Sequence, residues 1–227
     1  MALHKNSPKR IIYPGAVYYI VIKTQDNYPY FKELIFCDLF IENLRLCRQL
    51  KGFKLYGFSI IYDHVNLLIR PDECFNISKV IKSLKENVSR DINVVMGYTF
   101  ENLAPNVGDT PTCRLRLGEH SALSRLRGWK LLFAEKNFDK KYPPKDIKNY
   151  KVAFNEKFGR EIIFPKFKWQ QSFWDHFIRF HNNILRQEKD WDFHYNYTVY
   201  NHIKHGLPAD WKYTSINYPE LLNSIEE

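Results

Sequence analysis

Two strand-like apolar runs, Lys54–Ile61 and His64–Arg70, are separated by only two residues, Tyr62 and Asp63. A connection of two residues between strands is typical of a tight β-hairpin, because parallel strands need a much longer crossover. Pro71 ends the second run, since proline has no N–H to donate to a neighbouring strand. The hairpin is therefore the element around which the rest of the chain must be arranged.

The segments that flank this hairpin alternate between strand and helix patterns. Residues 17–23 (VYYIVIK) are rich in β-branched and aromatic side chains, which predicts a strand. Residues 36–50 carry apolar side chains at helical spacing, and Gly52 follows as a C-cap glycine would. Residues 76–93 predict a second helix, with Asn76 as its N-cap. The order strand, helix, strand, strand, helix begins a ferredoxin-like β-α-β-β-α-β unit, so we expect an α+β fold with an antiparallel sheet.

Residues 97–165 interrupt this order. The segment begins with loop composition, continues with closely spaced arginines and ends with a stretch rich in lysine and proline. The arginines are Arg114, Arg116, Arg125 and Arg127. We interpret residues 97–165 as a basic subdomain inserted into one domain that spans residues 1–227.

Composition narrows the functional classes. The formal net charge is +9 and the pI is about 9.2, so nucleic acid is the first partner to consider. The cysteines show neither zinc-finger spacing nor a disulfide framework, which predicts reduced thiols in a cytoplasmic protein. They are Cys37, Cys47, Cys74 and Cys113. No apolar run has the length of a signal-peptide core at the N-terminus or of a membrane span elsewhere, so we expect no membrane association.

His64 and Asn66 are two residues apart on the second strand of the hairpin, so their side chains leave the same face. An imidazole and an amide placed side by side can share a metal ion, or they can be ordinary polar residues at the edge of a sheet. Asp63 can orient the imidazole of His64 as a carboxylate partner, or it can be a turn residue.

The C-terminal third predicts two helices, one centred on residues 182–189 and one over residues 191–204, with Gly206 ending the second. Tyr197 and Asn201 are four residues apart and therefore share one face of that helix. If this face meets the strand of His64, nitrogen and oxygen donors suited to Mg²⁺ or Mn²⁺ would converge beside a phenol. A phenol beside a metal-polarised phosphate is an arrangement for nucleophilic attack on phosphorus.

Each of these residues also has a common structural explanation. A histidine at the start of a strand and a tyrosine in an aromatic-rich chain are most often packing residues, and Asn201 can be a capping or turn residue. His176, His181, His194 and His205 lack the spacing of known metal motifs and are interpreted as surface or packing residues. The arginine cluster and Lys9 and Arg10 of the N-terminal arm can contact phosphates or form a solvated basic face.

Four segments in order resemble the REP-associated tyrosine transposases, which belong to the single-tyrosine HUH superfamily of the insertion-sequence-200 type. The segments are IIYDHVNLLIRP, NISKVIKSLK, WQQSFWDHFIR and HYNYTVYNHIKHGLPADWKYTS, and the opening KRIIYPGAVYYIVIKTQDNYPYF is similar as well. The resemblance covers about residues 8–96 and 166–216 and leaves out the insertion.

The resemblance implies a ferredoxin-like HUH core, a divalent metal ion and a helix tyrosine that attacks single-stranded DNA. The product would be a 5′-phosphotyrosine link, and the substrate would be hairpin-forming repeat DNA. By this resemblance Tyr197 matches the nucleophile, Asn201 the polar residue one turn later and His64 the first histidine of the motif. Trp169, Asp175 and His176 match a family signature whose role we interpret as structural or DNA-proximal.

Asn66 departs from the family pattern, which has histidine at this position. An amide keeps an oxygen donor, so His64, Asn66 and Asn201 can still form a ligand set for Mg²⁺ or Mn²⁺. The alternative is a domesticated, catalytically weakened, sequence-specific DNA-binding protein. His202 replaces a family proline, and we expect this change to loosen the turn.

Two further questions stay open at the level of sequence. A third hypothesis for the function is an RNA-binding ferredoxin-like domain, although no RNP-like pattern of basic, glycine and aromatic residues supports it. The site can also form within one chain or across a homodimer.

Overall fold

The computed structural model describes residue 13 and residues 15–98, 146–159, 163–178 and 184–224, without the side chains of residues 184–187. Its sheet has four strands in the order β2-β3-β1-β4, and every neighbouring pair is antiparallel. The strands are β1 (Tyr18–Lys23), β2 (Lys54–Ile61), β3 (His64–Arg70) and β4 (Trp174–Phe177). The helices are α1 (Leu34–Lys51), α2 (Ile77–Val95), α5 (Ile147–Phe158) and α6 (Ile184–Lys204).

The order β1-α1-β2-β3-α2-α5-β4 is that of a ferredoxin-like unit with one added helix, α5, before the last strand. With β1 and β3 at the centre of the sheet, it confirms the predicted ferredoxin-like α+β fold. The local predictions around the hairpin are confirmed too. Gly52 ends α1 in the left-handed conformation (φ 65°), and its N–H donates to the carbonyl of Arg48. The side chain of Asn76 accepts from the N–H of Lys79 at the start of α2.

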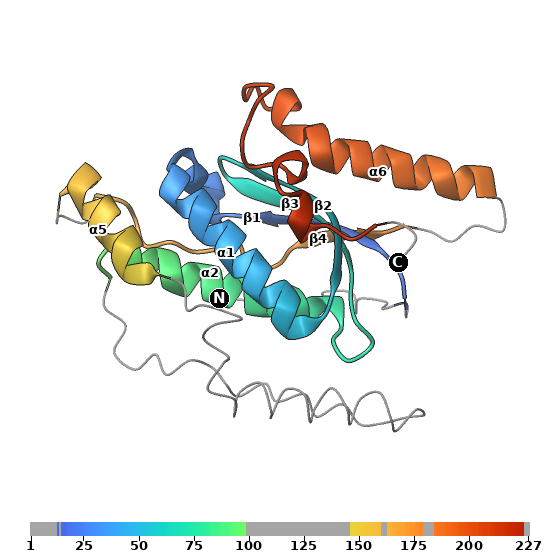
Figure 1. Ribbon diagram of the computed structural model, residues 1–227, viewed down its shortest axis with the longest axis horizontal. Helices are drawn as coiled ribbons and strands as arrows, with labels where there is room; N and C mark the ends of the chain where they lie inside the picture. The colour runs from blue at the N-terminus through green and yellow to red at the C-terminus, as the bar shows by residue number, and fades with distance from the viewer. Residues whose placement is uncertain (1–12, 14, 99–145, 160–162, 179–183, 225–227) are drawn as a thin grey trace, which may run out of the picture.

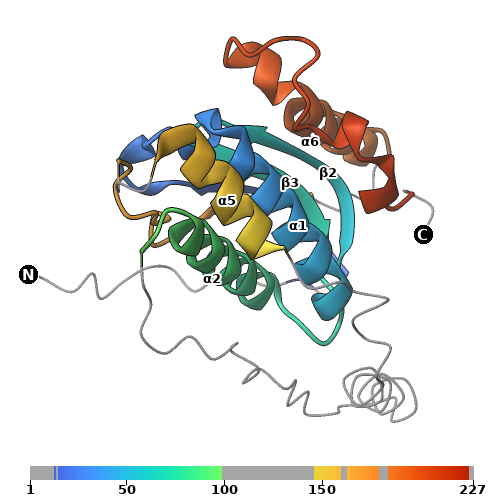
Figure 2. The ribbon, with the colours of Figure 1, turned by 60° about the vertical axis from the view of Figure 1, so that its left-hand side comes forward.

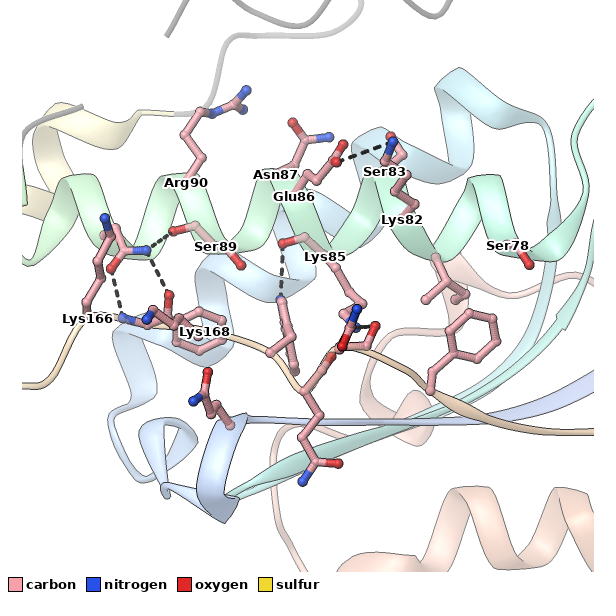
Figure 3. Close-up of a pocket in the computed structure, with 18 of the residues that line it drawn as sticks. Ser78, Lys82, Ser83, Lys85, Glu86, Asn87, Ser89, Arg90, Lys166 and Lys168 are labelled. Carbon is pink, nitrogen blue, oxygen red and sulfur yellow. Dashed lines mark hydrogen bonds and ion pairs between the residues drawn. The ribbon is translucent and has the colours of Figure 1, made fainter. Parts of the chain in front are cut away.

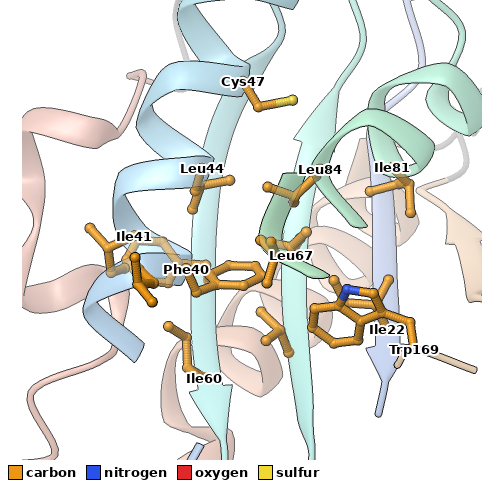
Figure 4. Close-up of a cluster of buried hydrophobic side chains, with 14 of the residues drawn as sticks. Ile22, Phe40, Ile41, Leu44, Cys47, Ile60, Leu67, Ile81, Leu84 and Trp169 are labelled. Carbon is orange, nitrogen blue, oxygen red and sulfur yellow. The ribbon is translucent and has the colours of Figure 1, made fainter. Parts of the chain in front are cut away.

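Helices cover both faces of the sheet (Figures 1 and 2). α1 and α2 lie on one face, which we call the inner face, and α5 packs beside α2. Apolar side chains from three strands and both helices meet there around Phe40, Leu67 and Leu84 (Figure 4). Alternate residues of β1 and β3 point into this core, so the residues between them point to the opposite, outer face.

α6 covers the outer face of β2 and β3 (Figure 1). The prediction of two C-terminal helices is wrong: residues 184–204 form one continuous helix. The stretch contains neither glycine nor proline, so nothing in it forces a break between the two predicted segments. The polar residues Glu188 and Lys189, at the predicted boundary, are simply exposed to solvent.

Part of the predicted insertion belongs to the main core. Phe154 of α5 is buried and stacks on Phe36 of α1, with ring centroids 5.6 Å apart. Residues 99–145 lie outside the described residues, so a separate basic subdomain stays a prediction. None of the helices in the described parts of the chain combines the length and the apolar character that a membrane span requires.

Gly57 of β2 sets the distance between the sheet and α6. A Cβ at this position would lie 3.5 Å from Thr198 Cγ2 and 3.6 Å from Val199 Cγ2, both on α6. A methyl group therefore fits in ordinary contact, whereas a larger side chain would push the helix away from the sheet.

We expect Gly57→Val to lower the free energy of unfolding by about 1–3 kcal/mol through overpacking. Gly57→Ala is the matched control and should change it by less than about 1 kcal/mol, because alanine also loses less backbone entropy than glycine on folding. Urea denaturation followed by circular dichroism measures both changes. Equal stability of the two variants would contradict a close approach of α6 at this point.

Candidate functional site on the outer face of the sheet

The polar residues predicted from the sequence lie between the sheet and α6. His64 and Asn66 stand opposite Lys23 and Val21 of β1, so they share the outer face with Tyr19, two residues further along that strand. α6 passes over this face and carries Tyr197 and Asn201. The strand and the helix that the sequence singled out therefore meet within one chain.

His64 is held from both sides of its ring. Its Nδ1 lies 2.7 Å from Asp63 Oδ1, and its Nε2 lies 3.3 Å from Asn201 Nδ2. The hydrogen bond from His64 lowers the pKa of the Asp63 carboxyl, so Asp63 is an acceptor at neutral pH. The proton of a neutral His64 then sits on Nδ1, which leaves the lone pair of Nε2 directed toward Asn201.

Asn201 brings an unused oxygen to the same place. Its side chain is fully buried, and its Oδ1 makes no hydrogen bond to any described residue. A buried amide oxygen without a partner costs about 1–3 kcal/mol, so such atoms usually mark a missing ligand or water. The oxygen of Asn201 and the Nε2 atom of His64, whose lone pair faces Asn201 Nδ2 in this structure, are donor types that a divalent cation takes.

Asn66 is buried as well, but its side chain is already engaged. Tyr19 Oη donates to Asn66 Oδ1 at 2.8 Å, and Asn66 Nδ2 donates to Ser59 Oγ at 3.4 Å. Burial, followed by the nearby Tyr197, raises the pKa of Tyr19, so the phenol stays protonated and remains a donor. One lone pair of the Asn66 oxygen is thus occupied, and only the second is left for a cation.

Tyr197 is half-buried beside this network. Its ring meets the ring of Tyr19 edge-on at 5.8 Å, and Lys204 Nζ lies 4.1 Å from the Tyr197 ring centroid. Tyr19 therefore touches Tyr197 through its ring and Asn66 through its hydroxyl. Sequence reasoning missed Tyr19, because its membership of the outer face follows only from the pairing of β1 with β3.

The structure corrects the expectation for His202. The ring is buried, with Nδ1 3.2 Å from the carbonyl oxygen of Val199 and Nε2 3.3 Å from that of Ala209. A side chain that spans the end of α6 and the following segment fastens the turn rather than loosening it. His205 follows and places its ring edge-on to His64, with centroids 4.8 Å apart.

A second polar cluster lies on the other side of Tyr19. His176 of β4 meets Asp190 and His194 of α6, and the ring of His194 stacks on Tyr19 at 5.1 Å. The interpretation of His176 and His194 as separate surface or packing residues missed this convergence. A one-turn spacing of Asp190 and His194 was visible in the sequence, but the contribution of β4 was not.

A basic groove of about 1010 Å³ lies between α2 and residues 166–173 (Figure 3). Asn93 fixes one wall by exchanging two hydrogen bonds with the backbone of Phe167, and Trp169 Nε1 donates to the carbonyl of Lys85. Six basic residues and one acidic residue line the groove: Lys51, Lys82, Lys85, Arg90, Lys166, Lys168 and Glu86. The basic residues singled out from the sequence, Lys9, Arg10, Arg114, Arg116, Arg125 and Arg127, lie outside the described residues.

Residues 14–102 match the model of the family described as "Transposase IS200 like". Among solved structures, one described as a REP-associated tyrosine transposase bound to a REP hairpin is 13% identical, with a TM-score of 0.46 over 96% of this chain and 88% of that one. A putative transposase from Deinococcus radiodurans R1 is 17% identical, with a TM-score of 0.33 over 56% of this chain and 96% of that one. No curated protein matches the chain.

We expect Tyr19→Phe to lower the free energy of unfolding by about 1–2 kcal/mol, because Asn66 Oδ1 loses its buried donor. Tyr200→Phe is the control. Tyr200 is 47% exposed on α6, so the loss of its hydroxyl leaves no buried group without a partner. Chemical denaturation of the two variants and the parent protein measures the difference. A Tyr19→Phe variant as stable as Tyr200→Phe would contradict the hydrogen bond.

Proposed function

We propose that this chain, whose residues 14–102 match the model of the IS200-like transposase family, nicks and joins single-stranded, hairpin-forming DNA through a 5′-phosphotyrosine intermediate. The observation that carries the proposal is the contact between Asn201 of α6 and His64 of β3. This contact brings the helix of the nucleophile candidate onto the strand of the metal-ligand candidates within one chain. It therefore favours a site formed in one chain over a site shared across a homodimer.

In the proposed reaction Tyr197 Oη attacks a phosphorus atom of the DNA backbone. The phenol loses its proton and forms a P–O bond, the bond from phosphorus to the 3′ oxygen breaks, and that oxygen takes up a proton. One phosphate ester replaces another, so a later 3′-hydroxyl can reverse the step and join the strand elsewhere. The packing of the Tyr197 ring against Tyr19 supports this role, because it holds the half-buried phenol in place.

His64 and Asn201 would hold a divalent cation, and Asn66 would add a donor through its second lone pair. A bound Mg²⁺ or Mn²⁺ would supply charge neutralisation at a non-bridging phosphate oxygen. Asp63 fixes the ring of His64 by its hydrogen bond to Nδ1, so Nε2 is already oriented without the ion. Tyr19 and Ser59 fix the amide of Asn66 in the same way.

The charge of the molecule supports a polyanionic substrate. The net charge of +9 attracts DNA over long range, and the groove beside α2 offers lysine side chains that can contact phosphates. Lys82, Lys166 and Lys168 are exposed there. Such contacts would hold DNA without reading its sequence, while the site on the outer face would act on one phosphate.

The hydrogen bonds of Asn66 favour a second candidate function, a DNA-binding protein that no longer cleaves. An amide that is held by Tyr19 and Ser59 is stable without a metal ion. A protein of this kind would bind the same hairpin DNA and form no covalent adduct.

We expect Tyr197→Phe to abolish a denaturation-resistant adduct with hairpin DNA in the presence of Mn²⁺, while DNA affinity stays within about twofold. Tyr200→Phe, on the same helix one turn further on, should form the adduct in normal yield. Gel electrophoresis of the labelled DNA under denaturing conditions measures the adduct, and fluorescence anisotropy measures binding. Undiminished adduct in Tyr197→Phe would refute Tyr197 as the nucleophile.

We expect Asn66→His to increase metal-dependent adduct formation by about tenfold or more, because an imidazole replaces an amide whose oxygen is partly engaged. Asn66→Ala is the control and should show no increase. The yield of adduct as a function of Mn²⁺ concentration measures the effect. No adduct from the parent protein or from Asn66→His, with normal DNA binding, would favour the second candidate function.

A further inference from the structure

We propose that His176, Asp190 and His194 form a second metal site, for a transition ion of the Zn²⁺ type, which joins the edge strand β4 to α6. The site is separate from the one at His64, and its existence does not depend on the proposed function. Two imidazoles and one carboxylate form a donor set that binds Zn²⁺ and neighbouring divalent ions, with one position left for water.

The three residues come from two consecutive elements, the edge strand β4 and α6. His176 stands opposite Tyr19 in the pairing of β1 with β4, so its side chain lies on the outer face. Asp190 and His194 are one turn apart on α6 and share the face that meets it. One ligand atom from each residue lies within 4.8 Å of the other two.

The distances favour a coordination shell over a simple ion pair. Asp190 Oδ1 lies 3.4 Å from His194 Nε2 and 3.6 Å from His176 Nε2. A hydrogen bond between a charged imidazole and a carboxylate is shorter, about 2.7–2.9 Å. Two ligands of a tetrahedral Zn²⁺ lie roughly 3.3 Å apart, because each sits about 2.0–2.1 Å from the ion.

Burial favours the same conclusion. His194 is only 8% exposed, and the Nε2 atom of His176 is buried without a hydrogen bond to any described residue. A buried imidazole nitrogen without a hydrogen bond is costly, and a bound ion or water would satisfy it.

An ion at this place would stiffen the part of α6 that precedes Tyr197. His194 is one turn before Tyr197, and the ring of Tyr19 lies against both side chains. Holding His194 against β4 would therefore also hold Tyr19 and, through it, the amide of Asn66. The role of the ion is positional, because none of its three ligands is in the ligand set at His64.

Metal binding to the untagged, chelator-treated full chain tests the proposal. We expect one Zn²⁺ per chain by isothermal titration calorimetry, visible absorption bands of a tetrahedral shell with Co²⁺, and a melting temperature raised by roughly 5 °C at a hundredfold excess of Zn²⁺ over its Kd. His176→Ala and Asp190→Ala should each weaken binding by about tenfold or more and remove the thermal shift. Near-ultraviolet circular dichroism without metal verifies that the variants are folded.

Two controls separate this site from others. Asp192→Asn removes an exposed carboxylate two residues further along α6, and His64→Ala removes the candidate ligand on β3. Both should keep the Zn²⁺ whose binding His176→Ala removes. The proposal fails if the parent protein binds no Zn²⁺ stoichiometrically, or if His176→Ala binds it as tightly as the parent. It fails equally if Asp192→Asn or His64→Ala loses the same Zn²⁺.

Discussion

The packing of α6 on the outer face of the sheet is the constraint on which the site depends. The inner face of the sheet is buried under α1 and α2 mainly by apolar contacts. The outer face is different, because it carries His64, Asn66 and Tyr19. Gly57 allows the helix to come close enough that these polar groups are removed from water.

This burial turns a row of polar residues into a set of fixed partners. In water each of these groups could hydrogen-bond to solvent, but under the helix an unpaired donor or acceptor is costly. Asp63 pairs with His64, and Tyr19 pairs with Asn66. Among the described residues, the buried atoms under this helix that make no hydrogen bond are Asn201 Oδ1, His176 Nε2 and His194 Nδ1.

The sequence predicted the fold well because turns, helix ends and strands are each determined by residues that lie close together in the chain. The two-residue connection predicted the hairpin, Gly52 and Asn76 predicted helix ends, and short apolar runs rich in β-branched and aromatic residues predicted the strands. The pairing of His64 with Asn201 followed only from the family resemblance, since no local pattern links positions 137 residues apart. The continuity of α6 was missed because polar residues in the middle of a helix look like a boundary when the buried face is unknown.

Tyr19 and the cluster at His176 were beyond sequence reasoning for a related reason. Their positions depend on which strands are neighbours, and β4 is a four-residue edge strand with little pattern of its own. Once the order β3-β1-β4 is known, Tyr19 stands between Leu68 and His176, in the middle of the outer face.

The position of Tyr19 affects what asparagine can do at residue 66, where the resembled family has histidine. An amide at this position needs a donor for its oxygen, and the protonated phenol of Tyr19 is that donor. An imidazole at residue 66 would instead offer Tyr19 a ring nitrogen, and its other nitrogen would be left for a cation. Asn66 and Tyr19 therefore act as a pair: the same phenol that satisfies the amide also decides how much of its oxygen is available to a metal ion.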